Sequence, residues 1–269
     1  MLTLAKVIWG ARCGKSARRV LLGETRSSGH AYSVRGARES AALRQAPHGL
    51  PSSRLVSTIL LDQWFEDEVK PRLKGKAFEV RYVDDVLLCF QHKEDAQKVL
   101  TVLEKRFSKY GLSLHPVKTC LVEFGRLALT TAERTKTQPA TFEFLGFVHV
   151  SARSRRGKFM VKVKTMKTRL KRSLKAAEQW CKEHRHDPVK DQQATLNAKL
   201  RGHYQYYGRA SNNRALRQYF NGVRGMWKKW LNRRTRGTTL HWDKYLQLLR
   251  RHPLLLPRIT HSWANTRSP

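Results

Sequence analysis

The chain has few acidic residues for its length. Only 20 Asp and Glu stand against 54 Lys and Arg in 269 residues, which gives a formal net charge of +34 and an isoelectric point near 10.8. This excess of positive charge repels itself in a compact fold, and a polyanionic partner relieves the repulsion. Nucleic acid is therefore the first expected partner, and an anionic membrane surface is the electrostatic alternative.

Cysteine and long apolar segments are also scarce. The four cysteines lie far apart with no CxxC pair, so neither a zinc knuckle nor a dense disulfide framework is indicated. No apolar run reaches the roughly 18 to 20 residues that span a bilayer, so insertion into a membrane is not expected. Of the two electrostatic alternatives we favour nucleic acid and expect no membrane partner. A reducing compartment suits this composition. We expect the bacterial cytoplasm, with a mitochondrion or plastid as the alternative.

The charges that are present are distributed unevenly. Residues 1–60 hold ten Lys and Arg against two acids, residues 61–150 hold fourteen against thirteen, and residues 151–269 hold thirty against five. A near-neutral segment followed by a strongly basic one predicts a chemistry module joined to a polyanion-binding module. Apolar residues make up 40% of the chain, which suffices for a hydrophobic core.

Residues 1–58 show no sustained hydrophobic periodicity and are rich in Arg, Ser, Gly and Ala. We expect a poorly ordered or out-of-frame leader, and this acid-poor composition also overlaps with that of a transit peptide. Clear periodicities follow. In order, we expect a helix of about three turns over 59–69, strands over 78–82 and 86–90, a helix over 96–107 that stops at Gly111, strands over 119–124, 142–150 and 159–163, and basic helices over 170–181, 196–207 and 216–231.

Two adjacent carboxylates, Asp84 and Asp85, stand between the first two predicted strands. Adjacent carboxylates repel one another, which favours a bound cation, although aspartates are also common in turns. The surrounding residues, Arg81-Tyr82-Val83-Asp84-Asp85-Val86-Leu87-Leu88-Cys89-Phe90, resemble the palm hairpin of reverse transcriptases. In that hairpin an aromatic-x-Asp-Asp motif holds magnesium for nucleotidyl transfer.

Further motifs follow in the order of that family. Gly111-Leu112-Ser113-Leu114 with Lys118-Thr119 is similar to the next family block, and residues 142–147 are similar to the primer-grip block after it. Residues 196–207 resemble the maturase-specific thumb region called domain X. The chain is thereby identified as a member of the group II intron reverse transcriptase/maturase family over roughly residues 58–265.

The resemblance implies an α+β fold, in which a partial palm of antiparallel strands and helices precedes an α-helical thumb. The implied divisions are a leader over 1–58, a palm over 59–164, a thumb and domain X-like region over 165–240, and a C-terminal extension over 241–269. Asp84 is the implied direct ligand of Mg²⁺ and Asp85 supports the site. Lys118 is implied to lie near the incoming triphosphate. The primer-grip-like residues are Phe144, Leu145 and Gly146.

Basic and aromatic side chains of the helical half are predicted to bind RNA, because cations neutralise phosphates and tyrosines stack on bases. They are Lys167, Arg169, Lys171, Arg172, Lys175, Arg201, Tyr204, Tyr206, Arg209, Arg214 and Arg217. Aromatic residues at helical spacing also form cores, and we expect that role for Trp227 and Trp230, whereas Tyr206 suits either role. The implied partner is group II intron RNA, with an RNA or DNA primer–template as a second partner.

The fingers of the family and an earlier palm strand with another metal-binding aspartate are not visible ahead of Asp84. Asp62 does not fill this gap, because in the family the helix that contains it comes after the missing strand. With an incomplete carboxylate cluster, magnesium would be held weakly. We therefore expect intron RNA binding and splicing assistance without autonomous polymerisation. The alternative is a non-catalytic RNA-binding remnant or a degenerate open reading frame.

Overall fold

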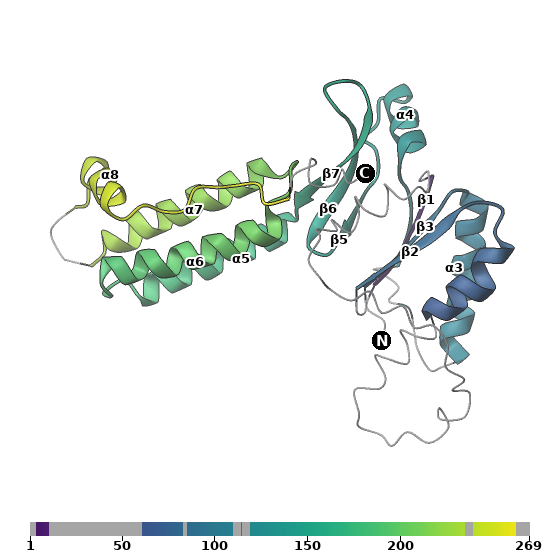
Figure 1. Ribbon diagram of the computed structural model, residues 1–269, viewed down its shortest axis with the longest axis horizontal. Helices are drawn as coiled ribbons and strands as arrows, with labels where there is room; N and C mark the ends of the chain where they lie inside the picture. The colour runs from purple at the N-terminus through teal and green to yellow at the C-terminus, as the bar shows by residue number, and fades with distance from the viewer. Residues whose placement is uncertain are drawn as a thin grey trace, which may run out of the picture. The chain divides into compact units, whose positions relative to one another are not determined.

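The computed structural model of the chain describes residues 4–10, 61–82, 85–109, 114, 119–234 and 239–261. The chain folds as two compact units, Met1–Ala140 and Thr141–Pro269. Each unit contains a sheet of its own (Figure 1), and the predicted α+β class is confirmed. The boundary differs from the predicted palm–thumb boundary at residue 164, because the strands just before that residue fold with the helices that follow them.

The first unit has a four-stranded sheet in the order β2-β3-β1-β4. Its strands are β1 (Leu4–Trp9), β2 (Ala77–Tyr82), β3 (Asp85–Phe90) and β4 (Cys120–Glu123). β2 and β3 form the predicted antiparallel hairpin, with Tyr82 opposite Asp85. The strand predicted over 119–124 is confirmed as β4.

β1 lies inside this sheet, where the sequence predicted a poorly ordered leader. It pairs in parallel with both β3 and β4, and Val7 and Ile8 are 0% and 1% exposed. The prediction was wrong for this segment, because six residues are too few to establish a periodicity. A strand with neighbours on both edges is stabilised by pairing partners that are distant in the sequence. Residues 11–60 of the predicted leader lie outside the described part of the chain.

Helical segments cover one face of this sheet. They are a π-helical turn η2 (Trp64–Val69) that continues from residues 61–63, a 3₁₀ turn η3 (Lys70–Arg72), and α3 (Lys93–Lys109), while α4 (Arg126–Arg134) follows β4. Apolar side chains of η2 and α3 pack on Phe90 of β3, which meets Phe65 edge to face at a centroid distance of 6.2 Å. The predicted helices before Pro71 and over 96–107 are confirmed, and α4 was not predicted. Gly111 lies outside the described residues.

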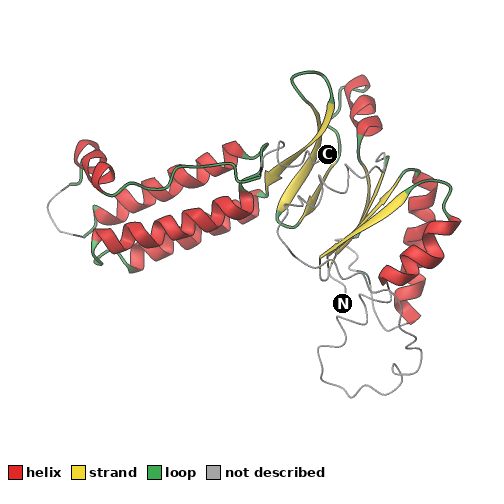
Figure 2. Ribbon diagram, in the orientation of Figure 1, coloured by secondary structure: helices red, strands yellow, loops and turns green. Residues whose placement is uncertain are grey.

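The second unit combines a three-stranded antiparallel sheet, in the order β5-β6-β7, with long helices (Figure 2). Its elements are β5 (Thr141–Phe144), β6 (Phe147–Arg153), β7 (Phe159–Thr165), α5 (Lys167–Glu183), α6 (Val189–Tyr207), α7 (Asn213–Leu231) and α8 (Trp242–Arg251). The three predicted basic helices are confirmed as α5, α6 and α7. α8 was not predicted.

The single strand predicted over 142–150 is a hairpin. Phe144 pairs with Phe147 across Leu145 and Gly146, whose φ angles are 48° and 77°. Two consecutive residues with positive φ form the kind of turn whose twist matches an antiparallel hairpin. The prediction was wrong because leucine rarely adopts a positive φ. The sequence Leu145-Gly146 therefore does not indicate a two-residue turn, although glycine at the second position allows one.

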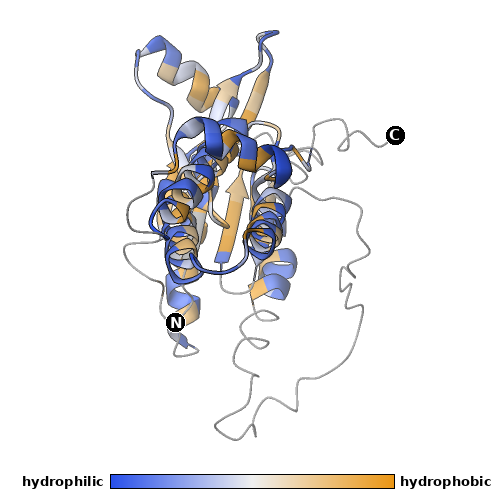
Figure 3. Cartoon of the chain, turned by 90° about the vertical axis from the view of Figure 1, so that its left-hand side faces the viewer, coloured by the Kyte–Doolittle hydropathy of each residue, from blue (hydrophilic) through white to orange (hydrophobic). Residues whose placement is uncertain are grey.

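Buried aromatic residues hold the helices together. Trp227 and Tyr204 are both 0% exposed, and each satisfies its polar atom. Trp227 donates from Nε1 to Gln192 Oε1 at 2.8 Å, and the Tyr204 hydroxyl donates to the Leu255 carbonyl at 3.0 Å. The predicted core position of Trp227 is confirmed, and Trp230 is partly buried against the same cluster. Figure 3 shows hydrophilic residues over much of the outer surface of these helices.

The turn before α7 fastens β7 to the helices. Buried Asn212 accepts a hydrogen bond from the Thr165 amide at 2.9 Å and donates to Thr165 Oγ1 and to the Tyr207 carbonyl at 2.6 and 2.8 Å. Ser211 Oγ accepts from the Val163 amide and donates to the Val163 carbonyl, each at 2.8 Å. These bonds satisfy the edge of β7, and they explain why the sheet belongs to the helical unit.

Replacing Asn212 by alanine removes three hydrogen bonds and leaves the buried Thr165 amide without its acceptor. We expect the free energy of unfolding of the second unit to fall by about 2–3 kcal/mol, measured by urea denaturation. Ser211→Ala is the matched control, because Ser211 is less buried and its loss should cost about 1 kcal/mol. A cost of Asn212→Ala no larger than that of Ser211→Ala would contradict this account.

Candidate catalytic hairpin and nucleic-acid interface

The position of Asp85 follows from the hydrophobic strand behind it. Residues 86–90 of β3 are buried, and Asp85 begins that strand opposite Tyr82 of β2 and Leu4 of β1. Tyr82, the last residue of β2, is exposed. Asp84, the predicted direct ligand of magnesium, lies outside the described residues, as does Lys118.

Phosphoryl transfer with two metal ions needs a cluster of carboxylates around both ions. The strand beside Asp85 does not supply one, because β1 has the sequence LAKVIW and pairs Leu4 with Asp85. Within the described residues, no group of three or more His, Cys, Asp or Glu side chains is arranged to hold a metal ion.

A separate group of charged residues joins β2 to the helical turn that carries Asp62. Arg81 donates from Nη1 to Asp62 Oδ1 at 3.1 Å. Burial, together with the neighbouring charge of Asp62, raises the pKa of Glu79 above its usual range. Asp62 is thus an ion-pair partner of Arg81 in the β2–β3 hairpin.

The primer-grip-like residues form the β5–β6 turn. The Leu145 carbonyl accepts a hydrogen bond from the Tyr206 hydroxyl at 2.9 Å, and the Gly146 carbonyl accepts one from the Met166 amide at 3.1 Å. Phe144 is buried. Phe144 is therefore a core residue. The hydrogen bonds that the Leu145 and Gly146 carbonyls accept attach the turn to Tyr206 and Met166.

The tyrosines of α6 have different environments. Tyr204 was predicted to bind RNA, but it is fully buried and hydrogen-bonded in the helical core, so that prediction is wrong. Its position on the apolar stripe of α6 turns the ring inward. Tyr206 is exposed. Its ring stacks on Phe147 at a centroid distance of 5.6 Å, so Phe147 covers one face of the Tyr206 ring.

Most of the predicted RNA-binding cations lie on the surface of the second unit. The exposed ones are Lys167, Arg169, Lys171, Arg172, Lys175, Arg201, Arg214 and Arg217. None of these eight forms an ion pair with another described residue. Arg209 differs, because its guanidinium lies over the ring of Phe147 at 5.9 Å and burial lowers its pKa.

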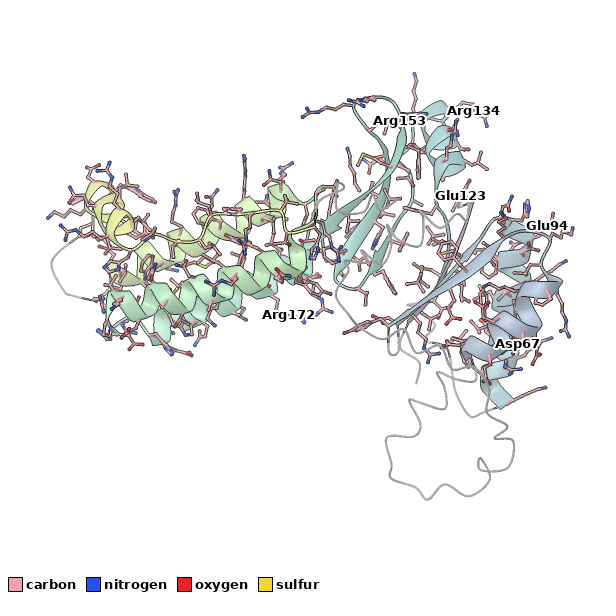
Figure 4. All side chains as sticks on the ribbon, viewed as in Figure 1. Asp67, Glu94, Glu123, Arg134, Arg153 and Arg172 are labelled. Atoms are coloured by element: carbon pink, nitrogen blue, oxygen red, sulfur yellow. The ribbon has the colours of Figure 1, made fainter. Side chains whose placement is uncertain are left out.

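The cations of α5 are arranged as a row. Lys167, Lys171 and Lys175 lie one helical turn apart, and side chains at this spacing are about 5–6 Å from one another. Arg172, labelled in Figure 4, extends the positive surface around the helix. α7 contains no acidic residue. The eight exposed cations named above carry positive charge that no described residue neutralises by an ion pair, and such charge is the electrostatic requirement for binding a phosphate backbone.

His203 does not belong to this positive surface. It is buried, and its ring stacks on Tyr219 at a centroid distance of 3.7 Å. Burial away from water lowers the pKa of His203 to about 4. The imidazole is therefore neutral at neutral pH and acts as a core aromatic.

Comparison with known protein families supports the class of the first unit. The family model of reverse transcriptases (RNA-dependent DNA polymerases) matches residues 15–149, half of the chain. The chain therefore belongs to the reverse transcriptase family. The match includes the β2–β3 hairpin, begins inside the predicted leader and ends within β6. No curated protein matches the chain.

Two expectations from composition bear on this assignment. None of the described helices is long and apolar enough to cross a membrane. Cys89, Cys120 and Cys181 are free thiols, and Cys13 lies outside the described residues. The family-model match confirms the family at the level of reverse transcriptases, and the group II intron subfamily stays a prediction.

Acidification should destabilise the second unit through His203. In the unfolded chain an imidazole titrates near pH 6.5, so below that pH the unfolded state binds a proton that the folded state does not bind until about pH 4. The stability contributed by neutral His203 is complete above pH 6.5 and is lost as the pH falls toward 4, by up to about 3 kcal/mol.

Urea denaturation at a series of pH values measures this loss. His203→Phe keeps the ring stacking on Tyr219 and should reduce the pH dependence between these values. A slope in His203→Phe as steep as that of the wild type would refute the assignment.

Proposed function

We propose that this chain is a group II intron-type reverse transcriptase/maturase fragment that binds intron RNA and assists its splicing, without polymerising DNA on its own. The observation that carries this proposal is the set of eight exposed cations on the second unit that have no ion-pair partner among the described residues. Binding of such a surface to a polyanion is favourable because it releases the counterions that were condensed on the polyanion.

The shape of the second unit supports a folded RNA as the partner. Its cations lie on α5, α6 and α7, which a buried aromatic core joins into one rigid support. Fixed cations on several helices match phosphates that a folded RNA brings together from separate strands, whereas a disordered basic tail would contact any polyanion equally. The proposal therefore includes a preference for structured RNA.

The first unit supports the absence of autonomous polymerisation. Leu4 of β1 pairs with Asp85, and the sequence of β1, LAKVIW, contains no carboxylate. The second candidate function is RNA-directed DNA polymerisation with the missing part supplied by another chain. It is favoured by the family match over residues 15–149, which includes the paired aspartates.

RNA binding is tested by a salt titration with a structured group II intron RNA, against duplex DNA and an unrelated RNA of equal length. Nonspecific phosphate contacts lose several orders of magnitude in affinity by about 0.2 M salt. We expect the preference for the intron RNA to survive at that concentration. Release of all three polymers at the same salt concentration would show that the protein binds them through charge alone and does not recognise the shape of the intron RNA.

A pair of charge-reversal variants locates the interface. The double variant Lys171→Glu, Arg172→Glu on α5 should weaken intron RNA binding at least about tenfold and reduce its salt dependence, because two phosphate contacts are lost. The control, Lys98→Glu with Lys105→Glu on α3 of the first unit, makes the same change in net charge at exposed positions. Equal effects of the two variants would assign binding to net charge alone.

Polymerase activity is tested with the purified full chain, a primer on an RNA template, nucleotides and Mg²⁺. We expect no primer extension, because β1, the strand beside Asp85, adds no carboxylate to a two-metal cluster. Asp84→Asn and Asp85→Asn should leave intron RNA binding unchanged. Extension by the wild type that either variant abolishes would establish the polymerase instead.

A further inference from the structure

α8 presents an exposed tryptophan beside two cations of α7. Trp242 is 50% exposed, and Leu246, one turn further along α8, is 45% exposed. The Lys228 ammonium lies 4.7 Å from the centroid of the Trp242 ring, and the Arg224 guanidinium carbon lies 5.9 Å from it. Because Arg224 and Lys228 are one turn apart on α7, both approach the indole from the side of that helix.

The indole is supported from the core. Tyr245, which is fully buried, meets Trp242 at a centroid distance of 5.7 Å with the two rings inclined by 67°. The Tyr245 hydroxyl donates to the Arg224 carbonyl at 2.7 Å, and the Tyr245 ring packs edge to face on Trp227. A ring held in this way loses little conformational entropy when a ligand stacks on it.

The two cations that lie over the Trp242 ring, Arg224 and Lys228, have no ion-pair partner among the described residues. α7 itself has no acidic residue. Asp243, next to Trp242 in the sequence, is exposed. Proteins that bind single-stranded nucleic acid combine the same two elements, an exposed aromatic ring for a base and cations for the adjacent phosphates.

We propose that Trp242 is a stacking platform for one unpaired base of RNA, and that Arg224 and Lys228 contact the phosphates that flank this base. The proposal rests on the RNA-binding function proposed above and adds the kind of element recognised, which is a single-stranded loop, bulge or end. A base within a duplex has both faces covered by its neighbours and offers none to an indole. A protein partner suits the patch less well, because Trp242 and Leu246 give a small apolar area bordered by cations.

The test compares an oligouridylate of about 12 nucleotides with a blunt RNA duplex, using the full chain. We expect Trp242→Ala to weaken binding of the single strand about tenfold while duplex binding stays within about a factor of two. Trp242→Phe should retain most of the affinity. Gln247→Ala, at an exposed position of the same helix outside the patch, is the matched control and should change neither affinity.

The dependence on salt separates stacking from charge. Lys228→Ala should lower the slope of log affinity against log salt for the single strand by about 0.7, the contribution of one phosphate contact. Trp242→Ala should leave this slope unchanged, because the indole carries no charge. Thermal unfolding of each variant checks its fold, and Trp242→Phe keeps the test valid where the alanine variant is destabilised.

The outcomes distinguish this proposal from the proposed function. Wild-type protein that binds intron RNA, but binds the single strand equally well with Ala or Trp at position 242, overturns the stacking platform alone. Equal losses on the duplex and the single strand in Trp242→Ala overturn it as well, because the effect is then on helix packing. Wild-type protein that retains none of these RNAs near 0.2 M salt overturns the proposed function and, with it, this inference.

Discussion

The mutual repulsion of the cations in the second half of the chain is the constraint on which the rest of that unit depends. Thirty Lys and Arg against five acids in residues 151–269 favour an expanded chain at low salt. A compact unit exists because burial of large apolar rings opposes this repulsion. Trp227, Tyr204 and Tyr245 are fully buried in the core of this unit, and each donates a hydrogen bond there. The core therefore holds the charges at fixed positions, where a polyanion can neutralise several of them at once.

The first unit obeys a different constraint, the pairing of a central apolar strand. β3 is buried along residues 86–90 and has a neighbour on each side, β2 in the antiparallel and β1 in the parallel direction. This pairing fixes Asp85 at the end of the sheet. It also places Leu4 of β1 opposite Asp85, and leucine has no ligating atom. The geometry thus joins the aspartate motif of a reverse transcriptase to a neighbouring strand that adds no carboxylate.

Sequence reasoning succeeded where the signal was local. The strands on either side of Asp84 and Asp85, the helices α3, α5, α6 and α7, and the core position of Trp227 follow from hydrophobic spacing, which is a property of adjacent residues. It failed where the cause was distant or unusual. β1 depends on partners more than 70 residues away, and the turn at Leu145 requires a conformation that leucine rarely adopts. Tyr204 and Tyr206 are both tyrosines of α6, yet one is buried and the other exposed.

By itself, the sequence determined the charge asymmetry, the family through its aspartate motif, and the hydrophobic periods of most helices and strands. Each of these depends only on residue types and on short spacings along the chain. Tertiary structure decided which residues each unit exposes. Asn212 and Ser211 attach the β5-β6-β7 sheet to the helices through bonds to β7, and the packing of α8 on α7 places Trp242 beside Arg224 and Lys228. No spacing rule contains such contacts, because they depend on how elements pack against each other and on which buried polar groups find partners.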